Sequence, residues 1–200
     1  MHPRNIYTRP PDFVQLARRY PPLREQYVSK SRSRESDALT LGNAIQRRLT
    51  EALLYLDFHI TLTLPDDRLC PPIIRCSRLN YVLWIQDLVR ATIPNSEIVR
   101  GIDIGTGASA IYPLLACRLE PTWQFIATGF LSLGTAERER NGLSDRVLIV
   151  QVPSNDPILH LIEGHPSTTY NFTMCNPPFY SSAEEVASLQ KQKNMGPTLY

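Results

Sequence analysis

No stretch of this 200-residue chain approaches the run of about 18 apolar residues that a membrane-spanning helix needs. The first residues, Met-His-Pro-Arg-Asn, are not followed by an apolar core, so they do not read as a secretory signal. The four cysteines form no Cys-x-x-Cys pair and the four histidines form no i, i+4 pair, which argues against a zinc site and a disulfide framework. These absences predict a soluble protein of a reducing compartment, without a structural metal.

A large excess of either charge is also missing, because 21 Lys and Arg face 19 Asp and Glu, for a net charge of +2. The charges are, however, unevenly distributed along the chain. The first 40 residues hold eight basic and four acidic side chains, a net charge of +4, and the rest of the chain carries −2. By itself such a basic leader is equally typical of a solvated segment.

Glycine is scarce, with 9 residues, whereas proline is abundant, with 17 residues, or 8.5% against a usual value of roughly 5%. Proline disrupts helix interiors and central strands. We therefore expect many of these prolines to mark boundaries, turns or a specialised loop.

Hydrophobic periodicity divides the chain into a helical first half and an alternating second half. Apolar residues recur at helical steps over 38–56 and 78–89, and residues 59–64 alternate like a short strand. Further along, strands are predicted at 99–104, 123–128, 146–152 and 170–175, and helices at 110–119, 135–140 and 156–163. This order predicts an α/β fold with a mostly parallel sheet and right-handed crossovers.

Two loops follow predicted strands directly, and both should lie at the carboxyl edge of the sheet, where ligands bind in such folds. The first is Asp103-Ile-Gly-Thr-Gly-Ala-Ser109. Its glycines can adopt positive φ and let a ligand approach the backbone, and the next helix offers unpaired N–H groups. A single G-x-G is also typical of a tight strand-to-helix turn, so either interpretation stays open.

The second loop, Asn176-Pro-Pro-Phe179, carries the stronger signal. Two prolines stiffen the backbone and restrict where its carbonyls point. A side-chain amide and a backbone carbonyl can then both face one amino group, and the aromatic ring offers a stacking surface for a base. The combination suits a planar amine such as adenine, although a structural proline turn is the plainer alternative.

The two loops together resemble the class I S-adenosylmethionine-dependent methyltransferases that modify exocyclic amino groups. The flanking sequence is similar to the methyltransferase-like 16 family of RNA adenine-N6 methyltransferases, which act on U6 small nuclear RNA and on certain mRNA hairpins. The resemblance extends from residue 1 to about residue 180. It is carried by His2-Pro-Arg-Asn, Pro10-Pro-Asp-Phe13, Arg78-Leu-Asn-Tyr81, Gly101-Ile-Asp-Ile-Gly-Thr-Gly-Ala-Ser109, Ile111-Tyr-Pro-Leu-Leu115 and Met174-Cys-Asn-Pro-Pro-Phe179.

This resemblance implies a Rossmann-like methyltransferase core over 99–180, a basic and mainly helical RNA-binding module over 1–98, and a polar tail over 181–200. It implies S-adenosyl-L-methionine as cofactor, structured RNA as partner, and a location in the nucleus or cytoplasm. The implied cofactor-binding residues are Arg78, Asp103, Gly105, Gly107, Ser109, Asp156 and Asn176. The implied catalytic residues are Asn176, Pro177, Pro178 and Phe179. The implied RNA-binding residues are Arg4, Arg9, Pro10, Pro11, Asp12, Phe13 and Arg18.

The chain departs from this pattern in two places. Class I enzymes usually end the second strand with an acid that accepts hydrogen bonds from the ribose, but here Gly129 stands at that end and no acid follows until Glu137. Loss of a charged acceptor costs about 1.5–3 kcal/mol. The family fold also continues with a helix and three strands, so residues 180–200 are expected to leave a C-terminally truncated member with an exposed sheet edge.

Three functions follow as hypotheses. The first is an RNA adenine-N6 methyltransferase, impaired by the missing acid and the short C-terminal part. The second is a catalytically inactive RNA-binding fragment of such an enzyme. The third, against which the similar leader argues, is methylation of a protein or glutamine amide, because the Asn-Pro-Pro-Phe pattern also occurs in that branch.

Overall fold

The computed structural model describes most of the chain, with gaps mainly near residue 70 and after residue 152. The described residues are 1–32, 38–64, 77–93, 97–107, 109–129, 133–152 and 168–177. Among the helices of these stretches, none has both the length and the apolar character that a bilayer crossing requires. The predicted helix at 156–163 and the tail after residue 177 lie outside the described residues.

Three helices form the leader: α1 (Phe13–Arg19), α2 (Pro21–Arg32) and α3 (Ala38–Phe58). Asp12 caps α1, because its side chain accepts hydrogen bonds from the backbone N–H groups of Val14 and Gln15. Proline begins α2, where its missing N–H costs little. The helices pack through buried leucines at Leu16, Leu23, Leu49 and Leu53. The mainly helical character predicted for this part of the chain is therefore confirmed.

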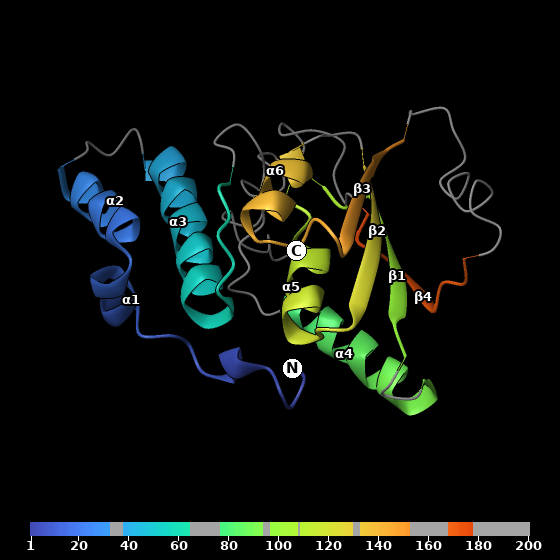
Figure 1. The fold of residues 1–200 in the computed structure, drawn as a ribbon. Coiled ribbons are helices and arrows are strands. Elements are labelled where there is room, and N and C mark those ends of the chain that lie inside the picture. Colours follow the sequence, from blue (N-terminus) through green and yellow to red (C-terminus); the bar gives the residue numbers. More distant parts are fainter. Residues whose placement is uncertain are drawn as a thin grey trace, which may run out of the picture.

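The second half builds a four-stranded parallel sheet in the order β3-β2-β1-β4. Its strands are β1 (Val99–Ile104), β2 (Trp123–Gly129), β3 (Val147–Gln151) and β4 (Phe172–Cys175). Helices α5 (Ile111–Leu119) and α6 (Leu133–Arg140) connect the first three strands. The predicted parallel α/β alternation is confirmed. Figure 1 shows the leader helices on one side of the molecule and the sheet on the other, with α5 and α6 between them.

One face of the sheet is closely packed around an aromatic cluster. The Trp123 and Phe172 rings lie 5.2 Å apart between centroids, and the Phe125 and Phe172 rings 5.7 Å apart. Gly101 makes this packing feasible, since a Cβ there would stand 2.5 Å from Phe172 Cζ and 2.8 Å from Phe125 Cε1. Helix α4 (Ser77–Thr92), like α5, contributes buried side chains to the same core.

The segment predicted as a strand at residues 59–64 is extended but joins no sheet in the described structure, so that prediction is wrong in this respect. Its alternation is real, because Ile60, Leu62 and Leu64 are buried and the threonines between them are exposed. The difference lies in its hydrogen-bond partners, which are side chains rather than a neighbouring strand. Asn141 bonds to both the N–H and the C=O of Thr61, at 2.8 and 2.7 Å.

Two buried carboxylates complete this attachment. Glu51 on α3 accepts a hydrogen bond from the N–H of Leu64 at 3.0 Å, and Glu137 on α6 accepts one from the N–H of Thr63 at 3.4 Å. The segment therefore ties the leader to the sheet domain through backbone groups that would otherwise lack partners.

The first residues of the chain run beneath α5 and dock on α4 (Figure 1). The Nδ1 atom of His2 accepts a hydrogen bond from the N–H of Arg4, so Nε2–H donates to Asp87, at 2.8 Å. The Arg4 guanidinium bonds to Asp87 and to Gln86. The hydrogen bond from His2, aided by the charge of Arg4, holds the pKa of Asp87 below its ordinary value.

We predict that Asn141→Ala lowers the free energy of unfolding by about 1–3 kcal/mol, because it leaves both backbone groups of Thr61 without their partner. Chemical denaturation would measure this. Glu139→Ala is the matched control two residues earlier, in the last turn of α6, since Glu139 is exposed and makes only a 3.8 Å ion pair. Equal stability of the two variants would contradict the attachment described for residues 59–64.

Candidate functional site

The sheet has a topological switch point at β1. From β1 the chain moves through β2 to β3, and then it returns to the other side of β1 as β4. The crevice outside the carboxyl ends of β1 and β4 is where ligands bind in folds of this type. Ile104 of β1 pairs with Cys175 of β4, so the residues that follow them, Gly105 and Asn176, leave the two adjacent strands side by side. The prediction that both loops lie at one edge of the sheet is confirmed.

The glycine turn after β1 has a backbone that only glycine adopts easily. Gly105 and Gly107 have φ of +70° and +69°, and a Cβ at either position would face open space. Thr128 at the end of β2 holds the turn. Its hydroxyl accepts a hydrogen bond from the N–H of Gly105 at 3.2 Å, and its C=O accepts one from the N–H of Thr106 at 2.7 Å.

The start of α5 behind this turn is buried, and its first backbone N–H groups belong to Ile111 and Tyr112, because Pro113 has none. Ala110 stands at the N-cap in a left-handed conformation, with φ of +47°, and no side chain caps the helix there. The first N–H groups of a helix have no partner within it, so they suit an anionic or electron-rich group. Ser109, one of the predicted cofactor residues, is buried directly before them.

Asp103 lies at the base of the turn and is only 1% exposed. Among the described residues, no donor completes a hydrogen bond to either of its carboxylate oxygens. Burial raises the pKa of Asp103 to about 6, and the nearby Thr106 hydroxyl opposes this only in part. An orphaned carboxylate at a ligand-binding edge fits a group that brings its own N–H or O–H donors, such as the amino acid or ribose part of a nucleoside cofactor.

Helix α4 brings a cation and a phenol to the same place. Burial raises the pKa of the Tyr112 hydroxyl, and the positive charge of the Arg78 guanidinium opposes this in part. The charge of Asp103 also reaches Tyr112, so Arg78 and Asp103 both lie near this ring. The Tyr81 and Tyr112 rings meet edge to face, 5.6 Å apart. A carboxylate-bearing ligand would find a suitable partner in Arg78.

The second loop is described as far as Pro177. Asn176 is half-buried and Pro177 is exposed, directly after the last residue of β4. The backbone N–H of Cys175 donates a hydrogen bond to the Tyr81 hydroxyl at 3.3 Å. Pro178, Phe179 and Asp156 lie outside the described residues, so their predicted roles are not tested by the structure.

No described acid takes the position of the ribose-binding carboxylate. Gly129 ends β2, paired with Gln151 of β3. The next acid, Glu137, is buried and bonded to the N–H of Thr63 and to Arg140, so it is committed to another part of the fold. A Cβ at Gly129 would meet only ordinary van der Waals contacts, the nearest being Thr106 Cγ2 at 3.6 Å.

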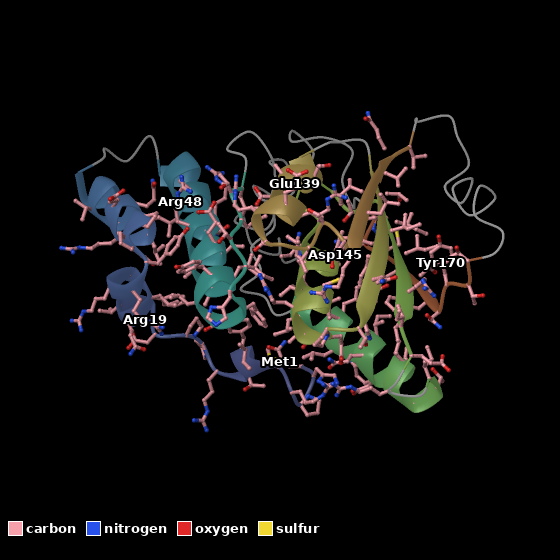
Figure 2. All side chains as sticks on the ribbon, viewed as in Figure 1. Met1, Arg19, Arg48, Glu139, Asp145 and Tyr170 are labelled. Atoms are coloured by element: carbon pink, nitrogen blue, oxygen red, sulfur yellow. The ribbon has the colours of Figure 1, made fainter. Side chains whose placement is uncertain are left out.

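The leader residues predicted to bind RNA divide into two groups. Arg4 and Asp12 already have structural partners, in Asp87 and in the α1 N-terminus respectively. The others are exposed except for Pro11, which is half-buried; they are Arg9, Pro10, Pro11, Phe13 and Arg18. Pro10, Pro11 and Phe13 line a cavity of about 240 Å³ together with Met1, Tyr7, Thr8 and Leu53. Figure 2 labels Met1 at the bottom of the molecule and Arg19 at the end of α1.

Sequence reasoning missed Tyr81 and Tyr112 as members of this site. The available signal was the spacing of Arg78 and Tyr81, which places both on one face of a helix. Their proximity to the two loops depends on how α4 and α5 pack against the sheet, which periodicity alone does not specify.

Comparison with known proteins gives consistent matches. A family model described as RNA methyltransferase matches residues 1–198. The chain is 37% identical over 203 residues to the RNA N(6)-adenosine-methyltransferase METTL16 of Gallus gallus, covering 98% of this chain and 36% of that protein. It is 37% identical over 192 residues to a U6 small nuclear RNA (adenine-(43)-N(6))-methyltransferase of Caenorhabditis elegans, covering 90% and 38%. The chain thus spans little more than a third of the length of these relatives.

Solved structures match over almost the whole chain. The N-terminal domain of human METTL16 in complex with SAH is similar with a TM-score of 0.74 at 32% identity, covering 98% of this chain and 78% of that one. The human METTL16 catalytic domain in complex with MAT2A 3′UTR hairpin 1 has a TM-score of 0.73 at 32% identity, covering 100% and 67%. These matches confirm the predicted class I methyltransferase fold.

We predict that Asp103→Asn changes how stability depends on pH. A carboxyl whose pKa rises from 3.8 to about 6 on folding supports the native state below pH 3.8 and loses that contribution as pH rises through 6. Relative to the variant, the wild-type chain should therefore lose about 3 kcal/mol between pH 3.5 and pH 7.5. Denaturation curves across that range would measure the difference, with the lowest pH as baseline. A difference that stays constant with pH would contradict the assignment.

Proposed function

Since the chain belongs to the RNA methyltransferase family whose model spans residues 1–198, we propose that it transfers a methyl group from S-adenosylmethionine to N6 of adenosine in structured RNA. The observation that carries this proposal is the position of Asn176-Pro177 beside the Gly105 turn at the switch point of the sheet. A loop suited to an amino group and a turn suited to a nucleoside cofactor lie on adjacent strands. The names of the similar human and nematode proteins support the same reaction.

In this proposal the described residues bind and orient the reactants. Arg78 would pair with the cofactor's carboxylate, and Asp103 and Ser109 would accept or donate hydrogen bonds around the glycine turn. When bound, S-adenosylmethionine supplies a methyl group on a positively charged sulfur. The Asn176 amide oxygen and the Pro177 carbonyl would hold the adenine amino group by its two hydrogens, which leaves its lone pair free to face that methyl group. Catalysis then depends mainly on positioning.

Residues outside the described structure complete the proposed site. Phe179 would stack on a flipped adenine, Pro178 would stiffen the loop, and Asp156 would contact the cofactor. We assign the core of the reaction to residues 99–180 and RNA binding to residues 1–98. Arg9 and Arg18, which are exposed, are the better candidates for phosphate contacts, because Arg4 already pairs with Asp87.

The RNA itself is proposed from the relatives. The similar nematode protein is named for U6 small nuclear RNA, and the similar human structure holds an mRNA hairpin. We therefore propose a structured small nuclear RNA or mRNA hairpin as partner, and the nucleus as the place where such a substrate would be met. The leader cavity beside Phe13 and the carboxyl edge of the sheet are the two surfaces that this RNA would contact.

A second candidate is an RNA-binding protein that retains the fold without turnover. Gly129 favours it, since the described residues offer no carboxylate for the ribose at the end of β2. The two candidates make opposite predictions for cofactor binding, and calorimetry with S-adenosylmethionine separates them directly.

We predict that Asn176→Ala lowers the rate of methyl transfer to a hairpin RNA by about 100-fold or more, because the target amino group loses its orienting acceptor. The assay follows a labelled methyl group from S-adenosylmethionine into RNA. A hairpin in which guanosine replaces the target adenosine is the substrate control. RNA binding by the wild-type chain without cofactor binding or turnover would favour the second candidate instead.

We also predict that Gly129→Asp tightens the binding of S-adenosylhomocysteine by about tenfold or more, because it restores a charged acceptor for the ribose hydroxyls. The backbone at Gly129 is not in the left-handed region and leaves room for a Cβ, so the substitution should be tolerated. Gly129→Asn controls for side-chain volume and should have a smaller effect. Equal affinities for the wild type and the Asp variant would mean that the ribose lies elsewhere.

A further inference from the structure

The structure assigns Tyr81 as the positioning residue of the loop that follows β4. We propose that its hydroxyl fixes the backbone of Asn176-Pro177 by accepting a hydrogen bond from the N–H of Cys175. The assignment concerns how that loop is held and rests on the proposed function only for its catalytic consequence.

The contact joins two parts of the chain that are 94 residues apart. The N–H of Cys175 lies 3.3 Å from the Tyr81 oxygen, and Cys175 is the last residue of β4. The next two residues, Asn176 and Pro177, bear the groups proposed to hold the adenine. A hydrogen bond at this amide therefore restrains the backbone one residue before the loop whose position the reaction requires. It does so at the residue where pairing of β4 with β1 ends.

The surroundings of Tyr81 favour a fixed hydroxyl. The residue is half-buried on the 16-residue helix α4, and its ring meets the buried Tyr112 edge to face at 5.6 Å. Tyr112 in turn lies beside Arg78. Met174, immediately before Cys175, is 2% exposed and anchors the strand in the core. The Tyr81 hydroxyl that contacts the loop is therefore held by a packed helix and not by another loop.

Such a contact matters because the proposed reaction depends on geometry. Asn176 and Pro177 would need to place an amino group in line with a methyl group, and a misplacement of about 1 Å can cost about 100-fold in rate. A site is held to that tolerance only when its supporting side chains are themselves locked by packing and hydrogen bonds. Tyr81 meets both conditions in the described structure.

Tyr81→Phe tests the assignment, because it removes the hydroxyl and keeps the ring against Tyr112. Protein labelled with 15N-cysteine gives amide signals for four cysteines, and Cys117 in the buried part of α5 serves as an internal reference. We expect amide exchange at Cys175 to speed up about 3- to 10-fold relative to Cys117. An unchanged ratio of the two rates would overturn the proposal. The ratio also corrects for any general loss of stability.

Tyr170→Phe is the matched control, since it removes a hydroxyl just before the other end of β4, at the outer edge marked in Figure 2. This variant should leave the exchange ratio as in the wild type. If both variants raise the ratio equally, the effect belongs to the strand in general, and the assignment of Tyr81 is wrong.

Turnover provides the second readout. For methylation of a hairpin RNA, Tyr81→Phe should lower kcat about tenfold or more and leave the KM for S-adenosylmethionine within about twofold, because the loop rather than the cofactor site is disturbed. A change confined to KM would overturn the catalytic consequence. A wild-type chain without turnover would refute the proposed function, and the exchange ratio would still decide whether Tyr81 holds the loop.

Discussion

The parallel pairing of β1 with β2 on one side and β4 on the other is the constraint on which the candidate site depends. Each strand brings its carboxyl end to the same edge, so Gly105, Thr128 and Asn176 converge although 71 residues separate the first from the last in the chain. The pairing in turn depends on close packing below that edge. Gly101 lets the rings of Phe125 and Phe172 approach the β1 backbone, and the Cβ of any larger residue there would collide with both rings.

Two features of the site, at Asp103 and Ala110, oppose folding. Asp103 is buried without a described donor, and Ala110 adopts a left-handed conformation at an uncapped helix start. Both features raise the free energy of the native state. Both features are explained if they form part of a preformed ligand-binding site. A ligand that donates hydrogen bonds to Asp103 and accepts them from the first N–H groups of α5 would supply the partners that these groups lack.

The leader is joined to the sheet domain by polar side chains rather than by a shared sheet. Glu51, Glu137 and Asn141 bond to the backbone of residues 61–64, and His2 and Arg4 bond to Asp87 on α4. These contacts orient the exposed surface around Phe13 relative to the core. Arg4 and Asp12, which the resemblance places among the RNA-binding residues, also form hydrogen bonds within the protein.

From residue 38 onward, and apart from residues 59–64, local sequence by itself determined the type and order of the described helices and strands, because periodicity, proline positions and glycine turns act over a few residues. The strands, the helix α5 and the common edge of the two loops were predictable in this way. Only the tertiary structure decided that residues 59–64 form hydrogen bonds with side chains and that Arg4 pairs with Asp87. It also decided that Glu137 bonds to Thr63 and so cannot replace the missing acid, and that the Tyr81 hydroxyl lies within hydrogen-bond distance of the Cys175 N–H. The physical reason is that each of these depends on how distant helices pack against the sheet, and a hydrogen-bond partner is chosen by position in space rather than by position in the chain.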